Sequence, residues 1–233
     1  MIKVILWDID NTLLDFLAAE AAAIRSCFRI FGLGECSDEM LSAYSAINVR
    51  WWERLERGEN TKPEILVGRF REFFSAYGLD ASCAEAFNDE YQVRLGDTIV
   101  FFPGAMETVT ALRGRAPQYG VTNGTRIAQH RKLKNSGLDK VLDRVFISED
   151  VGFEKPDRRY FDAVFAAVGD YAPEEIMIVG DSLTSDMRGG DNAGIVKCWF
   201  NPRGKKNDTD VRIDREIRAI PEVLGILDGT LLS

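Results

Sequence analysis

The sequence predicts an α/β protein with a parallel β-sheet and a block of helices inserted after its first strand. Strand-like and helical segments alternate from residue 105 onward, an order typical of a parallel sheet with helices on both faces. A single strand-like segment opens the chain, and helical segments separate it from the alternating region. We therefore expect the first strand to join the later sheet and the helices between them to form a separate domain.

Residues 2–7 are mostly apolar and partly β-branched, which predicts a buried strand. Asp8, Asp10 and Thr12 follow this strand directly. Ligands of open α/β sheets bind at the carboxyl ends of the strands, so both carboxylates are expected to face a crevice. Carboxylates held this close repel each other unless a cation joins them, and Mg²⁺ prefers such oxygen ligands. Taken alone, the pattern also fits a polar turn.

The segment after this turn is predicted to be helical. Gly32 and Gly34 end the first helix, Ser37 can cap the second, and Thr61 with Glu64 forms a capping-box pattern before the third. We expect helices at residues 17–31, 37–58, 62–78 and 82–95. These helices would form a cap of residues 16–98, and residues 1–15 and 99–233 would form the core.

The rest of the chain supplies the partners of the first strand. Apolar runs end at polar turns, and helical segments connect them. The polar stretch of residues 203–208 is expected to be a solvated loop. We expect strands at residues 119–122, 144–148, 176–179 and 195–199 and helices at residues 105–112, 125–136, 157–168, 185–193 and 221–227.

The composition excludes several classes of protein. The 233 residues are 45% hydrophobic and 28% charged, as in an ordinary globular protein. The formal net charge of −8 disfavours nonspecific binding to nucleic acid or to anionic membranes, because the protein's field repels both. No apolar run approaches the length of a membrane span, and the first residues lack the pattern of a signal peptide. A cytoplasmic protein is therefore expected.

Neither the cysteines nor the histidine indicates a reactive site. His130, the single histidine, lies in a basic helical segment in which no residue is an evident partner. The cysteines are scattered, with no Cys-x-x-Cys pair that would suggest a zinc or redox site, so we expect buried reduced thiols at Cys27, Cys36, Cys83 and Cys198.

Polar groups also follow three later strands, at the same edge of the predicted sheet. Thr122 and Asn123 can donate hydrogen bonds to phosphate oxygens, and Lys155 can neutralise a phosphoryl group. Asp181 can reach a metal ion from a neighbouring strand, and Asp186 can orient Lys155 or the waters of that ion. Each signal alone has an ordinary explanation as a turn or a solvated side chain. Together, and in this order, they predict one site for phosphate and metal.

On these motifs the chain resembles the haloacid dehalogenase (HAD) superfamily of phosphohydrolases. The resemblance covers the whole length, because members of this type carry a helical cap directly after the first motif. It implies an HAD-like Rossmannoid core with this inserted cap. The matching residues are Asp8-Ile9-Asp10-Asn11-Thr12, Thr122-Asn123-Gly124, Lys155-Pro156 and Gly180-Asp181 with Asp186.

The resemblance implies Mg²⁺-dependent hydrolysis of small phosphomonoesters. Asp8 would attack phosphorus to form an aspartyl-phosphate, and Asp10 would protonate the leaving oxygen and later activate water. Dehalogenases of the family lack the second acidic residue, so Asp10 favours phosphoryl chemistry. The ion would be held by Asp8, the backbone carbonyl of Asp10 and Asp181. The transferring oxygens would be bound by Thr122, Asn123 and Lys155.

A weaker resemblance, in the cap and in residues 145–152 and 198–201, is to bacterial HAD-type pyrimidine 5′-nucleotidases. It implies a nucleoside monophosphate as substrate. Trp51 or Trp52 would stack on a base, and Asn48 and Arg69 would supply polar contacts. The tryptophans fit the core of the cap equally well. Glu154 departs from the small or apolar residue common before the motif lysine.

Two other functions stay open at this point. The first is a phosphatase for phosphoglycolate or a sugar phosphate, with the same core and a different cap pocket. The second is a non-catalytic binding protein on the same fold, which the intact acidic and lysine motifs disfavour.

Overall fold

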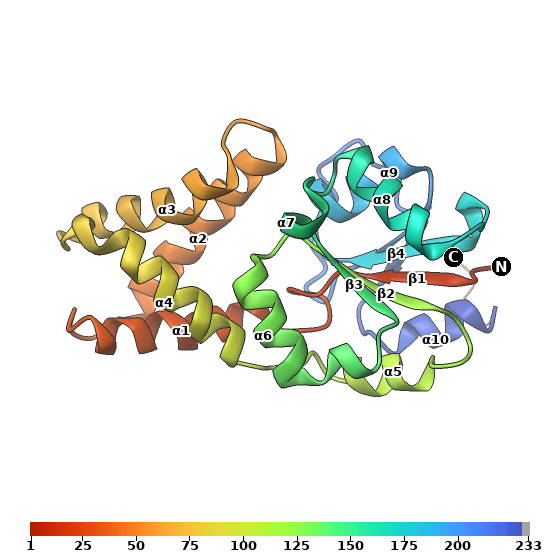
Figure 1. Cartoon of the computed structure of the whole chain (residues 1–233), viewed down its shortest axis with the longest axis horizontal. Coiled ribbons are helices and arrows are strands. Elements are labelled where there is room, and N and C mark those ends of the chain that lie inside the picture. Colours follow the sequence, from red (N-terminus) through yellow and green to blue (C-terminus); the bar gives the residue numbers. More distant parts are fainter. Residues whose placement is uncertain (230–233) are drawn as a thin grey trace.

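Residues 1–229, which the computed structural model describes, fold around a six-stranded parallel sheet with the order β3-β2-β1-β4-β5-β6. The strand that opens the chain is therefore central, and segments far apart in sequence flank it (Figure 1). The strands are β1 (Val4–Trp7), β2 (Gln118–Thr122), β3 (Arg144–Ile147), β4 (Ile176–Gly180), β5 (Val196–Phe200) and β6 (Arg215–Ile217).

Helices cover both faces of this sheet. Helices α8 and α9 lie on one face, and α5, α6 and α10 lie on the other (Figure 1). The side chains of β1 alternate between the two apolar layers: Ile5 and Trp7 face one, and Val4 and Leu6 face the other. The helices of the core are α5 (Ala105–Ala111), α6 (Arg126–Ser136), α7 (Ser148–Val151), α8 (Arg158–Val168), α9 (Arg188–Ala193) and α10 (Glu222–Leu227).

The register of the sheet brings the ends of its central strands together. Trp7, the last residue of β1, pairs with Val179 near the end of β4 and with Gly120 in β2. All residues of β1 are buried inside the sheet and its helical layers. Asp8 is therefore the first residue of the chain whose side chain can reach the carboxyl edge of the sheet. The polar residues that follow β1, β2 and β4 therefore lie at one edge of the sheet.

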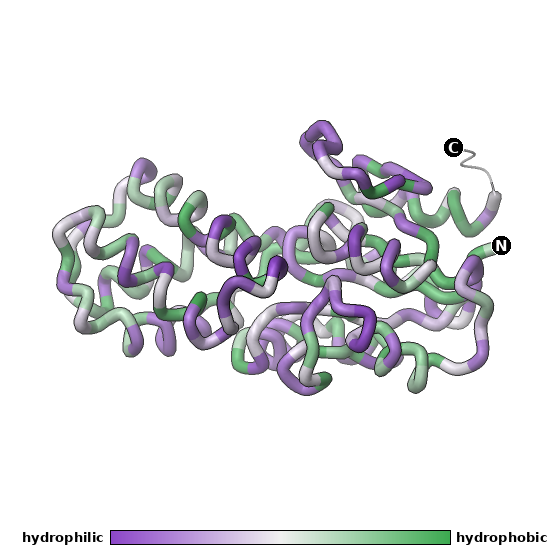
Figure 2. Tube along the Cα trace, turned by 90° about the horizontal axis from the view of Figure 1, so that it is seen from above, coloured by the Kyte–Doolittle hydropathy of each residue, from purple (hydrophilic) through white to green (hydrophobic). Residues whose placement is uncertain are grey.

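The inserted helices form a lobe beside the sheet, which we call the helical block (Figures 1 and 2). It has its own apolar cluster, and the predicted capping box is confirmed at the start of α3, where the Thr61 backbone N–H donates to Glu64 Oε2 at 2.7 Å. The predicted domain boundaries stay a prediction. The helices are α1 (Phe16–Ile30), α2 (Asp38–Glu56), α3 (Lys62–Ala76) and α4 (Ala84–Asp97).

The chain enters and leaves the helical block through two adjacent linkers. The Asp15 N–H donates to the Val100 carbonyl at 2.8 Å, and the Phe102 N–H donates to the Leu13 carbonyl at 3.0 Å. Leu14 and Phe101 form an antiparallel bridge between these bonds. The two linkers are thus tied to each other directly after the turn that carries Asp8 and Asp10.

The structure differs from the sequence predictions in some places. Strand β6 was not predicted, because Arg215-Glu216-Ile217 is short and charged and pairs only at the sheet edge beside β5. A π-helical turn, Leu183–Met187, precedes α9. Cys27, Cys36 and Cys198 are buried as predicted, but Cys83 is half-exposed in a short turn.

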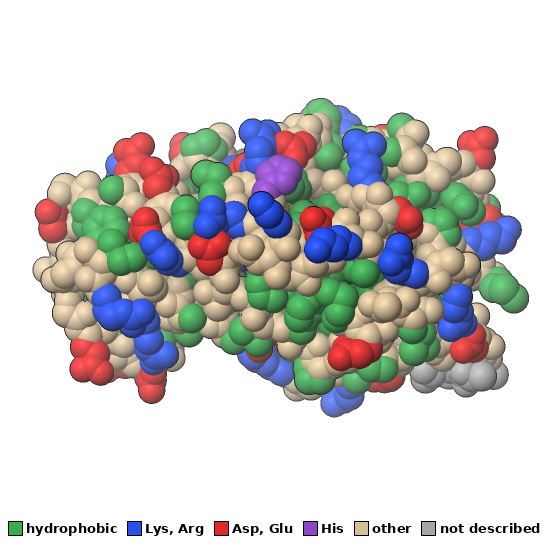
Figure 3. Space-filling view, turned by 60° about the horizontal axis from the view of Figure 1, so that its bottom comes forward, with side chains coloured by type: hydrophobic (Ala, Val, Ile, Leu, Met, Phe, Trp, Pro, Cys, Tyr) green, Lys and Arg blue, Asp and Glu red, His purple; other side chains and the backbone are tan. Residues whose placement is uncertain are grey.

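The described surface shows charges of both signs. Figure 3 shows Lys and Arg side chains interspersed with Asp and Glu side chains over one face of the molecule. Among the described helices, none combines the length and the apolar character needed to cross a membrane.

Candidate active site

Asp8 lies at the centre of the site, at the carboxyl end of β1. Its backbone N–H donates to the Val179 carbonyl at 2.9 Å, which fixes the start of the turn against β4. Its Oδ2 accepts a hydrogen bond from Thr12 Oγ1 at 2.9 Å. Asp8 is largely buried, so its carboxylate has few orientations available and faces the strand-end crevice.

Lys155 connects Asp8 to Asp186. Its Nζ lies 2.8 Å from Asp8 Oδ1, 2.6 Å from Asp186 Oδ1 and 2.8 Å from the Val121 carbonyl. These bonds use all three protons of the ammonium group, which is 1% exposed. Such complete pairing is what allows a charged lysine to be buried, and it holds the Asp8 carboxylate in one place.

The pKa values of this cluster reflect its burial and its excess of negative charge. Burial, and then the negative charge of Asp186, raise the pKa of Asp8 to about 7, while Lys155 opposes this shift. Burial and the Asp8 carboxylate raise the pKa of Asp181 well above its usual range. Burial alone would lower the pKa of Lys155, but Asp186 and Asp8 raise it above its usual value.

Asp8, Asp181 and Asp186 could together hold a metal ion. One carboxylate oxygen from each lies within 4.8 Å of the others. Trp199 Nε1 donates to the Asp181 carbonyl at 2.9 Å and so fixes the loop that presents this carboxylate. Crowded carboxylates at this spacing suit a hard cation with oxygen ligands, because the cation relieves their repulsion. The residues therefore fit Mg²⁺.

Asn123 fixes the loop around Lys155. Its Nδ2 donates to the Lys155 carbonyl at 2.8 Å, and its Oδ1 accepts from the Lys155 N–H at 2.8 Å. Thr122 Oγ1 accepts from the Gly124 N–H at 3.0 Å. Asn123 thus contacts Lys155 directly, and Thr122 follows Val121, whose carbonyl Lys155 binds. The phosphate contacts expected of both residues stay a prediction.

The Asp10 side chain points toward α6 rather than toward the acidic cluster. Gln129 Nε2 donates to Asp10 Oδ2 at 2.7 Å, and Lys132 Nζ pairs with Asp10 Oδ1. Sequence reasoning missed both α6 residues. Their spacing of three positions, on the helix after the Thr122-Asn123 strand end, was the available signal, but it does not say which helix face meets the site.

A cavity between the helical block and the core opens beside Asp10. The aromatic ring of Trp52 lines it, together with Arg69 and Lys132. Arg69 is 1% exposed and donates to Asn48 Oδ1 at 2.7 Å, and Asn48 in turn donates to Glu20 at 2.8 Å. Of the predicted substrate residues, Trp52 and Arg69 therefore line the cavity, and Asn48 supports Arg69.

Trp51 has a different environment from Trp52. Its ring packs on α3, where a Cβ on Gly68 would lie 2.5 Å from the ring. Its Nε1 donates to Glu72 at 2.8 Å. Of the two tryptophans named as possible base-stacking residues, Trp52 is therefore the one at the cavity, and Trp51 joins α2 to α3.

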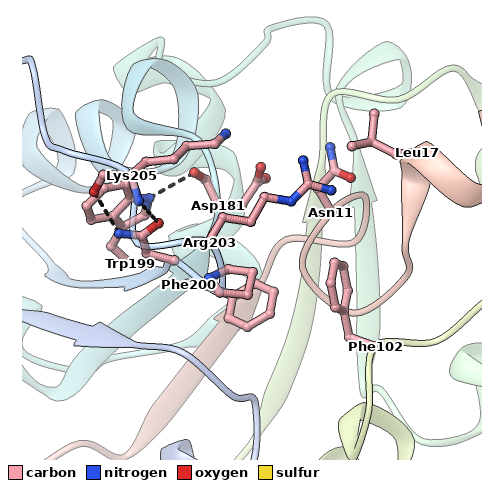
Figure 4. Close-up of a pocket in the computed structure, with 10 residues that line it drawn as sticks. Asn11, Leu17, Phe102, Asp181, Trp199, Phe200, Arg203 and Lys205 are labelled. Atoms are coloured by element: carbon pink, nitrogen blue, oxygen red, sulfur yellow. Dashed lines mark hydrogen bonds between the residues drawn. The ribbon is translucent and has the colours of Figure 1, made fainter. Parts of the chain in front are cut away.

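A second cavity lies on the other side of the turn after β1. Figure 4 shows Arg203 extended toward Asn11, with Asp181 and Lys205 beside it. Within residues 1–229, neither Arg203 nor Lys205 forms an ion pair with a carboxylate, and Asn201 holds the Lys205 backbone through bonds of 2.9 and 2.8 Å. The polar loop predicted to be solvated thus places two unpaired cations next to the acidic cluster.

Comparison with known proteins identifies the family. The model of haloacid dehalogenase-like hydrolases matches residues 2–194. The HAD-hydrolase YfnB of Bacillus subtilis is 35% identical over 97% of this chain and 95% of its own. The crystal structure of YfnB bound to magnesium superposes with a TM-score of 0.91, at 34% identity, over 97% of this chain and 99% of that chain.

Other relatives have names that state a substrate. The pyrimidine 5′-nucleotidase PynA of Streptococcus pneumoniae is 32% identical over 99% of this chain and 97% of its own. A glyceraldehyde 3-phosphate phosphatase of Methanopyrus kandleri is 30% identical over 93% of this chain and 91% of its own. With its strand-end acidic cluster, its parallel Rossmannoid sheet and these matches over nearly its full length, the chain belongs to the haloacid dehalogenase-like hydrolase family.

Proposed function

We propose that this protein is a Mg²⁺-dependent phosphatase that hydrolyses nucleoside 5′-monophosphates through an aspartyl-phosphate. The observation that carries the phosphatase assignment is the position of Asp8. Its carboxylate is held by Lys155 and Thr12 at a sheet edge, beside Asp181 and Asp186. A carboxylate fixed in this way can attack phosphorus without first reorganising its surroundings.

The chain supplies separate groups for attack and for proton transfer. Asp8 forms a bond to phosphorus while the bond from phosphorus to the ester oxygen breaks. Asp10, turned toward the cavity that would hold the leaving group, gives a proton to that oxygen and then removes one from the water that cleaves the aspartyl-phosphate. Lys155 offsets the charge on the phosphoryl oxygens and on Asp8.

Asp8 and Asp181, with Asp186 beside them, are the side chains that would hold Mg²⁺, together with the backbone carbonyl of Asp10. When bound, the ion would supply charge that offsets the repulsion between the carboxylate nucleophile and the anionic substrate. Uncatalysed hydrolysis of phosphate monoesters is so slow that enzymes accelerate it by up to ~10²¹-fold, so charge stabilisation at this site has a large barrier to lower.

The cavity beside Asp10 supports a nucleoside as the leaving group. Trp52 presents an aromatic ring on which a base can stack, and Arg69 presents a guanidinium held by neutral amide oxygens of Asn48 and Asn88. The similarity to PynA supports the same substrate class. The similarity to a glyceraldehyde 3-phosphate phosphatase favours a sugar phosphate as the second candidate.

A substrate panel tests the proposal. Mg²⁺-dependent phosphate release from UMP, dUMP, TMP, phosphoglycolate and a hexose phosphate is compared, with 4-nitrophenyl phosphate as a generic substrate. We expect the highest kcat/KM with a nucleotide. A clear preference for phosphoglycolate or hexose phosphate would overturn the nucleotide assignment, and no release from any compound would overturn the phosphatase assignment.

Adjacent tryptophans give a matched pair of variants. Trp52→Leu is expected to lower kcat/KM for the preferred nucleotide about 10-fold, because stacking on a base contributes about 1–3 kcal/mol, and to leave 4-nitrophenyl phosphate within about threefold. Trp51→Leu, which removes a ring packed on α3, is expected to lower stability and leave the ratio of the two substrates unchanged. If the ratio of kcat/KM for the nucleotide to kcat/KM for 4-nitrophenyl phosphate were the same in both variants, Trp52 would not contact the substrate.

A further inference from the structure

Lys62 belongs to the helical block, but its charge lies in the core. It is the first residue of α3 and is only 7% exposed. Its Nζ donates to the Asn123 carbonyl at 2.9 Å and to Ser148 Oγ at 2.6 Å, and it lies 3.2 Å from Glu154 Oε1. These partners follow β2, follow β3 and precede Lys155, so one side chain of the block contacts three segments of the core.

Two of these partners adjoin the catalytic lysine. Asn123 holds the Lys155 backbone through both ends of its side-chain amide, and Glu154 is the residue directly before Lys155. Lys155 in turn contacts Asp8. A continuous series of contacts therefore runs from the start of α3 to the proposed nucleophile. Glu154, the one departure from the motif pattern, has a partner in the helical block.

The same ammonium group also adjoins the proposed leaving-group cavity. Lys62 Nζ lies 6.0 Å from the centre of the Trp52 ring, which lines that cavity. A buried ammonium group is costly unless its hydrogen bonds and counter-charge are in place. Lys62 has both only while the start of α3 lies against the loops that carry Asn123 and Glu154. Its position is therefore specific to one placement of the block on the core.

We propose that Lys62 is a positioning residue that, through Glu154 and Asn123, sets the helical block against the phosphate-binding loop. This inference rests on the proposed function, in which the helical block binds the leaving group and the core binds the phosphoryl group. Lys62 contacts neither group. Lys62 fixes the distance between the leaving-group cavity and the phosphoryl site, so that a substrate of matching length occupies both sites at once.

The proposal predicts a loss that depends on the leaving group. Lys62→Met is expected to lower kcat/KM for UMP 10- to 100-fold and to lower it for 4-nitrophenyl phosphate threefold or less, because the small aryl group relies on the core alone. Lys62→Arg keeps a cation at this position and is expected to retain at least a third of the UMP value. Thermal unfolding monitors the folding of each variant.

A double-variant cycle identifies the partner. Glu154→Gln alone is expected to lower kcat/KM for UMP three- to tenfold. The double variant Lys62→Met/Glu154→Gln is expected to match Lys62→Met within twofold, because the second change removes a contact that is already lost. Arg50→Met and Glu72→Gln break an exposed ion pair inside the helical block and serve as matched controls, expected to leave the substrate ratio unchanged.

Two results would overturn the proposal. One is an equal loss for UMP and 4-nitrophenyl phosphate in Lys62→Met, which would indicate a general effect on folding or on the phosphate loop. The other is full additivity of the Lys62 and Glu154 changes. If the panel shows another preferred substrate, the proposed function fails separately, and the same ratio is measured with that substrate in place of UMP.

Discussion

The core and the helical block are stabilised around different kinds of side chain. The centre of the core's ligand edge is ionic: Lys155 is buried between Asp8 and Asp186, next to Asp181. The centre of the helical block is aromatic, and Phe70 contacts rings from α2 and α4 as well as from its own helix. Fixed charges suit a reaction that moves charge, whereas packed rings mainly fix the shape of the block and support the buried Arg69 beside them.

This difference indicates where each property of the protein can change. A substitution in the ionic centre is expected to alter the reaction, because Lys155 pairs with both Asp8 and Asp186 and holds them in place. A substitution in the aromatic centre is expected to alter stability, and it can reach the cavity through Arg69, which packs on the Phe70 ring. Rings of similar volume can replace one another there at a modest cost in stability. We therefore expect the chemistry to depend on the core and the choice of substrate to depend on the block.

The largest effect is expected from Asp8→Asn. The variant keeps the side-chain volume but removes the nucleophile and the charge that pairs with Lys155. We expect phosphate release from 4-nitrophenyl phosphate in the presence of Mg²⁺ to fall at least ~10³-fold, in line with the loss of a covalent nucleophile.

Asp170→Asn, an exposed site between α8 and β4, is the control and is expected to behave like the wild type. Activity of Asp8→Asn within tenfold of the wild type would contradict the Asp8 mechanism and, with it, the assignment of the chemistry to the ionic centre.

A second variant tests the aromatic centre. Phe70→Ala is expected to lower the free energy of unfolding by about 3–5 kcal/mol, because a fully buried ring is replaced by a cavity. Urea unfolding measures this loss. At a temperature where the variant stays folded, its kcat for 4-nitrophenyl phosphate is expected to remain within about threefold of the wild-type value.

Phe165→Ala, at a half-buried ring on α8, is the matched control and is expected to cost less stability. If folded Phe70→Ala lost aryl phosphatase activity as completely as Asp8→Asn, the two regions would not divide their roles as described.

The smallest effect concerns Glu56, at the boundary between the two regions. Its carboxylate accepts a hydrogen bond from Thr184, and burial raises its pKa to about 7 from 4.5, although that bond opposes the shift. The folded state thus holds this proton more tightly than the unfolded state. The resulting stability is present at pH 5 and is lost as the pH rises through 7.

Glu56→Gln cannot titrate, so it avoids this loss. At each pH we compare the free energy of unfolding of the variant with that of the wild type. This difference is expected to shift in favour of the variant by roughly 1–3 kcal/mol between pH 5 and pH 8. Urea unfolding at both pH values, with EDTA present to keep metal ions out, measures the change. A difference that does not vary with pH would mean that Glu56 is ionised throughout this range.

The sequence predicted the sheet and the members of its ionic cluster because each strand and its polar end are contiguous in the chain. Asp8, Lys155 and Asp181 each follow a short apolar or turn signal, and a parallel sheet places such ends at one edge. The side-chain partners were harder to predict. Nothing local indicates that Asp10 faces Lys132 or that Glu154 meets Lys62, because these contacts arise from how whole helices pack.

The helical block shows the same limit. Trp51 and Trp52 are adjacent on one helix and chemically identical, but they point about 100° apart, so one packs on α3 and the other lines the cavity. Helical spacing alone cannot separate them without the position of the core. Strand β6 escaped prediction for a related reason, since three residues at a sheet edge carry too little pattern.

The paired linkers at Leu13–Asp15 and Val100–Phe102 have a consequence for the history of such proteins. The two ends of the helical block are hydrogen-bonded to each other. For the core, the inserted block therefore takes up no more room along the chain path than a short turn would. A segment of any length whose ends lie this close can be inserted, enlarged or exchanged without shifting the register of β1. Exchange of the helical block at this one hairpin would therefore leave Asp8 and its partners in the core in place.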